Sequence, residues 1–102
     1  MNKLLICYDI SDKNITESTE YDLIKNELEK QDEWVHLQKS VWVVVTKATK
    51  DEMFEKLNNL LDKEKKNTLS VVNITKQSVQ WQHAKAKINN EQYVDKILST
   101  SY

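Results

Sequence analysis

The chain contains no glycine, no proline and no arginine, and these absences exclude several classes of function. The phosphate loop of NTPases and the G-x-G-x-x-G turn of dinucleotide-binding proteins both need glycine, because the backbone must approach the phosphate closely. Without arginine there is no planar fork to grip phosphate or carboxylate and no arginine finger. All 15 cations are lysines, balanced by 16 Asp and Glu to a net charge of -1. That balance argues against a protein that coats nucleic acid or membrane by charge.

Cysteine and long apolar runs are also scarce. The single Cys7 excludes an internal disulfide, and the two histidines are not spaced to form a zinc site with it. The first apolar run is too short for a signal peptide, and no segment approaches the length of a membrane span. With 102 residues, 39% hydrophobic and 30% charged, the composition fits one globular domain. We therefore expect a cytoplasmic protein with no membrane partner.

Four segments have the composition of strands. Residues 3–8 form a short apolar run, as expected of a strand covered on both faces. Residues 34–38 and 40–46 are β-branched or aromatic and predict two further strands, and residues 69–75 predict a fourth. The connection at Gln38-Lys39 lacks the Asn-Gly pair that two-residue hairpin turns prefer.

Two helices are predicted between these strands. One begins at Thr19 and runs to about Gln31, with apolar residues at helical spacing. The second begins at Thr49, which forms a capping-box pattern with Glu52, and we expect Asn67 to end it in the left-handed conformation that glycine usually takes. The apolar side of this second helix is Met53, Leu57, Leu60 and Leu61.

The C-terminal part predicts one more strand and one more helix. Val79 and Trp81 alternate with polar residues, which suggests a short edge strand. A last helix is predicted to begin at Asn89 or Asn90. Its apolar side is Tyr93, Val94, Ile97 and Leu98.

The order of these elements predicts an α+β fold of the ferredoxin-like type, β-α-β-β-α-β, with one antiparallel sheet and two helices on one face. Residues 1–75 form this core, and residues 76–102 add the extra C-terminal edge strand and helix within the same single domain. The aromatic and valine surplus at Trp34 and residues 41–45 fits a sheet buried on both sides. Two covers for the second face are open: a second copy of the chain, or its own C-terminal helix.

The first candidate site is the pair Asp9 and Asp12 after the first strand. Near a two-fold axis the two carboxylates become four, which is enough oxygen to hold Mg²⁺ with waters, and a metal-bound water could attack a phosphodiester. The alternative is that Asp9 accepts backbone N–H bonds within its loop, a common role for Asp at such positions.

Ser40 and His36 are the other candidate catalytic residues. Ser40 lies at the hairpin and could position a phosphate or a water, although hydrogen bonding within the turn is the preferred explanation. His36 lies on a predicted strand and could be a general base facing Asp9, or a half-buried, hydrogen-bonded strand residue. Cys7, inside an apolar strand, is predicted to be an inert core thiol.

Two short motifs resemble a known family. Residues 8–11 (Tyr-Asp-Ile-Ser) and 37–41 (Leu-Gln-Lys-Ser-Val) resemble the strand-end and hairpin motifs of the small CRISPR-associated integration subunits, Cas-two, and their VapD toxin relatives. A longer ordered set resembles the SinR-like small bacterial proteins of the same fold. That set comprises residues 8–9, 21–25, 34–43 and 69–72.

The resemblance implies a ferredoxin-like homodimer whose sheets pack face to face, with a last strand that pairs onto the partner. In the nuclease-like relatives the first-strand aspartates meet across the two-fold axis and bind a divalent ion, which implies Mg²⁺ or Mn²⁺ at Asp9, and the hairpin serine corresponds to Ser40. The arginines of the Cas-two pattern are missing here. Two functions follow. The first is a metal-dependent endoribonuclease or another dimer that acts on nucleic acid, with RNA or DNA as partner. The second is a catalytically silent homodimer that acts through protein contacts as a regulatory or defence-associated module.

Overall fold

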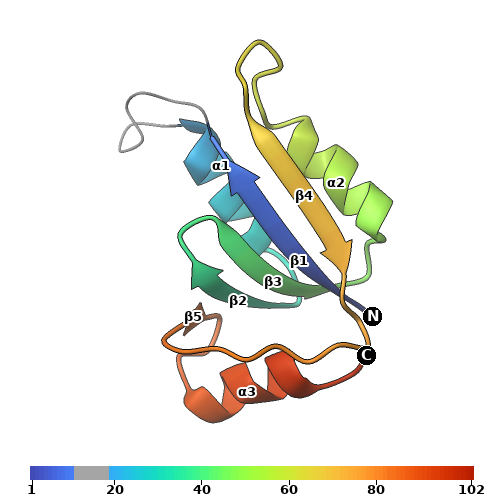
Figure 1. The fold of residues 1–102 in the computed structure, drawn as a ribbon, viewed down its shortest axis with the longest axis vertical. Coiled ribbons are helices and arrows are strands. Elements are labelled where there is room, and N and C mark those ends of the chain that lie inside the picture. The colour runs from blue at the N-terminus through green and yellow to red at the C-terminus, as the bar shows by residue number, and fades with distance from the viewer. Residues whose placement is uncertain (11–18) are drawn as a thin grey trace.

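The computed structural model describes residues 1–10 and 19–102 and is built around a five-stranded sheet (Figure 1). The strands follow the order β4-β1-β3-β2-β5, and every pairing is antiparallel. Three helices complete the α+β fold, so the predicted fold class is confirmed at that level. In chain order the elements are β1 (Asn2–Asp9), α1 (Thr19–Glu29), β2 (Glu33–Gln38), β3 (Val41–Thr46), α2 (Lys50–Asn58), β4 (Thr68–Asn73), β5 (Lys85–Ala86) and α3 (Glu91–Ser99).

Helices α1 and α2 cover one face of the sheet, which we call the first face (Figure 1). Alternate residues of β1 point to this face, as strand geometry requires. The apolar side chains buried there form the larger of two clusters. Its members are Leu4, Ile6, Tyr8, Ile10, Ile24, Leu28, Trp42, Val44, Met53, Leu57 and Leu61.

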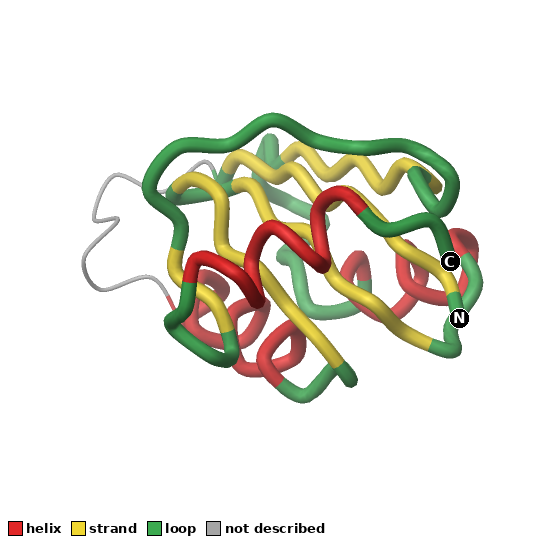
Figure 2. The backbone as a smooth tube through the Cα atoms, turned by 90° about the horizontal axis from the view of Figure 1, so that it is seen from below, coloured by secondary structure: helices red, strands yellow, loops and turns green. Residues whose placement is uncertain are grey.

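Helix α3 packs on the opposite, second face of the sheet, over β2 and β3 (Figure 2). It lies there with the connecting segment that follows β4. Of the two covers considered for the second face, the chain's own C-terminal helix is therefore present over this part. The buried apolar residues of the second cluster are Val35, Val43, Val45, Ala86, Val94, Ile97 and Leu98.

The β2–β3 hairpin turns at Lys39–Ser40, one residue later than the sequence suggested. The register between the strands shifts between His36 and Gln38, so an extra residue is accommodated before the turn. Such a bulge strengthens the local twist and replaces the glycine that a regular tight turn would need.

The predicted start of α2 is confirmed, but its predicted end is wrong. Thr49 is the N-cap, and its hydroxyl and the Glu52 carboxylate form the expected capping box. The helix ends at Asn58 rather than near residues 63–67, and two tight turns follow it through Leu61. Asn67 is not left-handed, because His83, with φ 56°, is the one residue with positive φ in the described part of the chain.

The strand predicted at Val79 and Trp81 is absent, and β5 forms at Lys85–Ala86 instead. The Val79 N–H donates to the Leu98 carbonyl at 2.9 Å, so this stretch pairs with the end of α3 rather than with a sheet edge. The predicted last helix is confirmed: α3 begins after Asn90, whose side chain accepts the first helical N–H groups.

Candidate functional site

Asp9 is the last residue of β1, and its side chain is exposed. It pairs with Thr68 of β4. Because Tyr8 belongs to the cluster on the first face, strand alternation puts Asp9 on the second face. The other carboxylate predicted for this site, Asp12, lies outside the described residues.

The hairpin turn is tied to the end of β1 and to α1 through Ser40. The Ser40 carbonyl accepts the Tyr8 backbone N–H at 3.1 Å, next to Asp9 in the chain. The Ser40 hydroxyl lies 2.5 Å from the Tyr21 hydroxyl, and the Lys39 ammonium lies 5.8 Å from the centre of the Tyr21 ring. The Ser40 hydroxyl therefore bonds to α1 rather than within its own turn, which differs from the explanation preferred for it.

A buried aromatic cluster supports the hairpin from the first face. The Trp42 indole N–H donates to the Tyr8 hydroxyl at 3.0 Å, and the Tyr8 and Tyr21 rings meet edge to face at 5.5 Å. Burial raises the pKa of Tyr8 to about 12, an effect that Trp42 opposes by donating its hydrogen bond and that Tyr21 adds to. The phenol of Tyr8 thus stays neutral and holds the strands together near the turn.

His36 belongs to this cluster and not to the neighbourhood of Asp9. Its ring stacks on Trp42 with 3.9 Å between ring centroids and 11° between planes. Its Nε2 lies 3.0 Å from the Lys39 carbonyl oxygen. Since Trp42 is on the first face and Asp9 on the second, the structure does not bring His36 and Asp9 together. These contacts agree with the alternative of a half-buried, hydrogen-bonded strand histidine.

Around Asp9 the second face carries a set of partly exposed apolar side chains, which we call the open patch: Leu5, Cys7, Val41 and Val72. Cys7 pairs with Val41 on one side, and Leu5 pairs with Val72 on the other. Val72 keeps 47% of its surface exposed. Burial raises the pKa of the Cys7 thiol, which agrees with the prediction that this cysteine is not a nucleophile.

The described residues of a single copy do not form a complete metal site. Within residues 1–10 and 19–102, no three His, Cys, Asp or Glu side chains lie together in a way that could hold one. Asp9 brings a single carboxylate, whereas Mg²⁺ in proteins needs several oxygen ligands. Asp9 and the other described residues of one copy therefore do not supply a full set of metal ligands.

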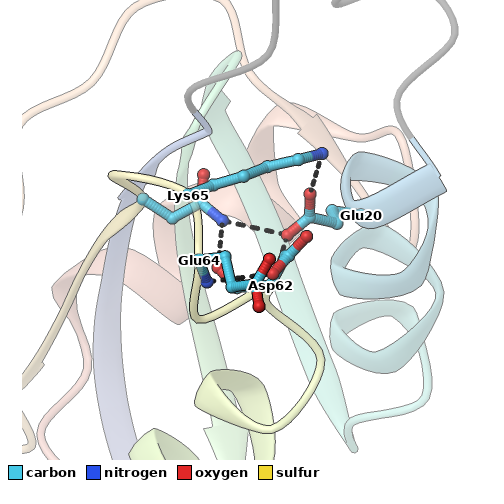
Figure 3. Close-up of polar contacts among 5 residues, drawn as sticks. Glu20, Asp62, Glu64 and Lys65 are labelled. Atoms are coloured by element: carbon cyan, nitrogen blue, oxygen red, sulfur yellow. Dashed lines mark hydrogen bonds and ion pairs between the residues drawn. The ribbon is translucent and has the colours of Figure 1, made fainter.

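The loop after α2 is anchored by Glu20 at the start of α1 (Figure 3). One Glu20 oxygen accepts the Asp62 backbone N–H at 2.7 Å and the Asn67 side-chain amide at 2.9 Å, and the other binds the Lys65 ammonium at 3.0 Å. Glu20 is only 8% exposed. The lysine-rich segment 63–66, predicted as a helix end, is instead a loop held to α1.

A surface depression of about 550 Å³ lies between residues 81–84 and the start of α3. Three of the polar side chains that line it are already used inside the chain. Trp81 donates to Asp95, Asn89 accepts the Ala86 N–H, and Asn90 caps α3. These bonds hold α3 in place, and Gln82, His83 and Glu91 add further polar side chains to the lining.

Sequence reasoning missed Tyr21 and Lys39 at this site. Tyr21 was counted only as an apolar residue of a helix, yet its hydroxyl reaches the hairpin serine. The available signal was its polar end, because a Tyr hydroxyl near a core usually has a partner.

Comparison with known proteins assigns the family. Comparison with curated proteins and with solved structures gave no match. No helix in the described part of the chain is long and apolar enough to cross a membrane. The profile of the family described as CRISPR associated protein Cas2 matches residues 1–83, whereas the resemblance to SinR-like proteins gains no support. The match spans β1 to β4, with Asp9 and the hairpin inside it, and so this chain belongs to the CRISPR associated protein Cas2 family.

Proposed function

We propose that the chain works as a homodimeric Cas2-type endoribonuclease in which Asp9 of each copy contributes to one shared site. The observation that carries this proposal is the position of Asp9, exposed on the second face at the border of the open patch. Membership of the Cas2 family supports it. The strand order β4-β1-β3-β2 supports a ferredoxin-like core for residues 1–75.

The open patch offers a surface on which a second copy would pack. A two-fold interface uses the same patch on both copies, so the open patch of one copy would pack on the open patch of the other. Asp9 is on the same face and at the end of the same strand, so the same packing would bring two Asp9 carboxylates toward the axis. This arrangement would supply the oxygen ligands that one copy lacks.

Two Asp9 carboxylates, with Asp12 of each copy as proposed further ligands, form an oxygen site suited to Mg²⁺ or Mn²⁺. A bound divalent ion would neutralise charge on a phosphodiester at this place. Ser40 and His36 are proposed to support the site from the first face by holding the hairpin beside Asp9. Their hydrogen bonds to Tyr21 and to the Lys39 carbonyl suit positioning rather than proton transfer.

RNA is the proposed substrate. Lys39 is a cation at the hairpin turn, with its ammonium over the ring of Tyr21. The test incubates the purified chain with single-stranded RNA, and separately with single-stranded DNA, in Mg²⁺ or Mn²⁺. We expect metal-dependent cleavage of RNA that Asp9→Asn lowers at least tenfold and that the exposed control Asp32→Asn leaves unchanged. Equal cleavage by the Asp9→Asn variant and the unaltered chain would refute the role of Asp9.

The second candidate is a catalytically silent homodimer that acts through protein contacts as a regulatory or defence-associated module. The absence of arginine favours it, because a duplex-binding or phosphate-gripping surface usually relies on that residue. A dimer that cleaves neither RNA nor DNA with either metal would decide for this function.

A further inference from the structure

Lys3, on β1, is fully buried and directs its ammonium at the end of α3. The Nζ atom contacts four backbone carbonyl oxygens, those of Gln77, Ile97, Leu98 and Thr100, at distances between 2.6 and 3.4 Å. Three of them lie in the last turn of α3 or just after it, where helix carbonyls lack intrahelical partners. A cation there is also favoured by the negative end of the helix dipole. Lys3 therefore caps α3 from the sheet.

Glu33, on β2, holds the same helix near its start. Its carboxylate accepts the hydroxyl hydrogen bond of Tyr93 in the first turn of α3. Lys3 and Glu33 both pair with Val45 of β3, so the two charges flank Val45 in one row across three strands. Lys3 and Glu33 thus hold the two ends of the helix, with the apolar second cluster between them.

Besides these contacts and the apolar packing of the second cluster, residues 76–102 are joined to the body through the short β5 and through Lys87, whose N–H and ammonium donate to the carbonyls of Trp34 and Asp32. Strand β5 is two residues long and pairs only with Val35 and His36 of β2. The Cas2 family match ends at residue 83, so β5 and α3 lie beyond it. Burial also lowers the pKa of Lys3, which reflects the cost of keeping its charge away from water. The four carbonyls offset that cost only while α3 is in place.

We propose that residues 76–102 form a cap over the second face that opens separately from the rest of the fold, and that Lys3 is the latch that keeps it closed. Opening the cap uncovers the apolar strip Val35, Val43 and Val45, which continues the open patch across β3 and β2. The cap therefore sets how much of the second face is available to a partner. The proposal concerns the cap itself and does not depend on cleavage or dimer formation.

Amide hydrogen exchange of the full chain, followed by mass spectrometry, tests the latch. In Lys3→Met the carbonyls at the end of α3 lose their donor, and a charge-assisted hydrogen bond of this kind is worth enough to change local opening about tenfold. We expect amides of α3 to exchange about tenfold faster, with unchanged exchange in β3 and α2. The matched control Lys96→Met removes an exposed lysine of α3 itself and should change nothing.

A second variant keeps the proposal falsifiable if Lys3→Met does not fold. Tyr93→Phe removes only the hydroxyl that binds Glu33, and it should speed exchange in the same α3 amides by a smaller factor. Unchanged α3 exchange in the variants that fold would overturn the latch. An equal rise in α3, β3 and α2 would also overturn it, because α3 would then open only with the whole fold.

Discussion

The Trp42 indole N–H donates to the Tyr8 hydroxyl at 3.0 Å inside the first core cluster, joining β3 to β1 directly. Both side chains are buried, so neither polar atom has water as an alternative partner. The pair also lies next to the Ser40 turn, which accepts the Tyr8 backbone N–H. One buried hydrogen bond therefore supports both the core and the hairpin beside Asp9.

Ionisation of Tyr8 should make stability fall at alkaline pH. Burial raises the pKa of Tyr8 from its ordinary 10.0 to about 12, so between these values the folded chain retains a proton that the unfolded chain has released. The stabilisation from this group is complete below pH 10 and is lost as the pH rises through about 12. Urea unfolding at a series of pH values above 9 measures this loss, as a decrease in the free energy of unfolding.

Tyr8→Phe is the matched variant for this measurement. It leaves the Trp42 N–H without its acceptor and so lowers stability by about 1–3 kcal/mol below pH 10, where Tyr8 is neutral in both the folded and the unfolded chain. Its free energy of unfolding should nevertheless depend less steeply on pH above 10 than that of the unaltered chain. Parallel curves for the two proteins would contradict the assignment of the titration to Tyr8.

Val72→Lys should weaken self-association through the open patch. The new charge would lie inside the two-fold interface and would have to lose water there. Sedimentation velocity at micromolar concentration should show the unaltered chain as a dimer and the variant shifted toward monomer. Phe54→Lys is the control, since Phe54 is 40% exposed but lies on α2, on the other side of the sheet. A monomeric unaltered chain would refute the proposed dimer.

Glu20→Gln should destabilise the fold by about 2 kcal/mol, because the side chain serves three donors and hydrogen bonds to a buried carboxylate are worth more than neutral ones. The amide can accept from only one of its two ends. Glu29→Gln is the comparison: it loses only a 3.9 Å surface ion pair to Lys25, a kind of contact worth little. Equal midpoints of urea unfolding for the two variants would show that the Glu20 anchor contributes nothing.

Thr49→Ala should cost about 1 kcal/mol by removing the N-cap of α2, whereas Thr49→Ser keeps the hydroxyl and should cost much less. The hydrogen bonds from Thr49 lower the pKa of Glu52. The ionised Glu52 carboxylate therefore stabilises the fold fully above the ordinary pKa of Glu52. This contribution is lost as the pH falls through the lowered pKa. Chemical unfolding at neutral and acid pH measures both effects. A Thr49→Ser variant as unstable as Thr49→Ala would exclude the hydroxyl as the cause.

Local patterns in the sequence were enough to predict most elements of the fold. The capping box at Thr49 and the cap at Asn90 are signals carried by a few adjacent residues, and both lie where they were expected. The continuous apolar run of residues 3–8 and the β-branched and aromatic residues of the later segments located β1 to β4 for the same reason. The end of α2 was misplaced, because apolar Leu60 and Leu61 continue the helical pattern into turns that pack on the core.

The features that sequence could not predict depend on distant partners. Lysine is among the residues least often buried, so nothing local marks Lys3 as the cap of a helix far along the chain. The two-residue β5 follows from where α3 docks rather than from its own composition. At the candidate site the sequence named Asp9, Ser40 and His36, but the face on which each one lies depends on register. The contact between Tyr21 and Ser40 depends in the same way on how α1 packs against the hairpin.

The contacts of Lys3 have a consequence for the order of folding. Its ammonium meets carbonyls that are 94 to 97 positions away, the separation that is slowest to close by chain diffusion. The β2–β3 hairpin and the contacts of α2 with β4 bring together nearer segments, so we expect the sheet to assemble first and α3 to dock last. Until α3 docks, the valines of β2 and β3 are exposed to solvent and can associate with other apolar surfaces. A chain caught at this stage would be the one at greatest risk of aggregation.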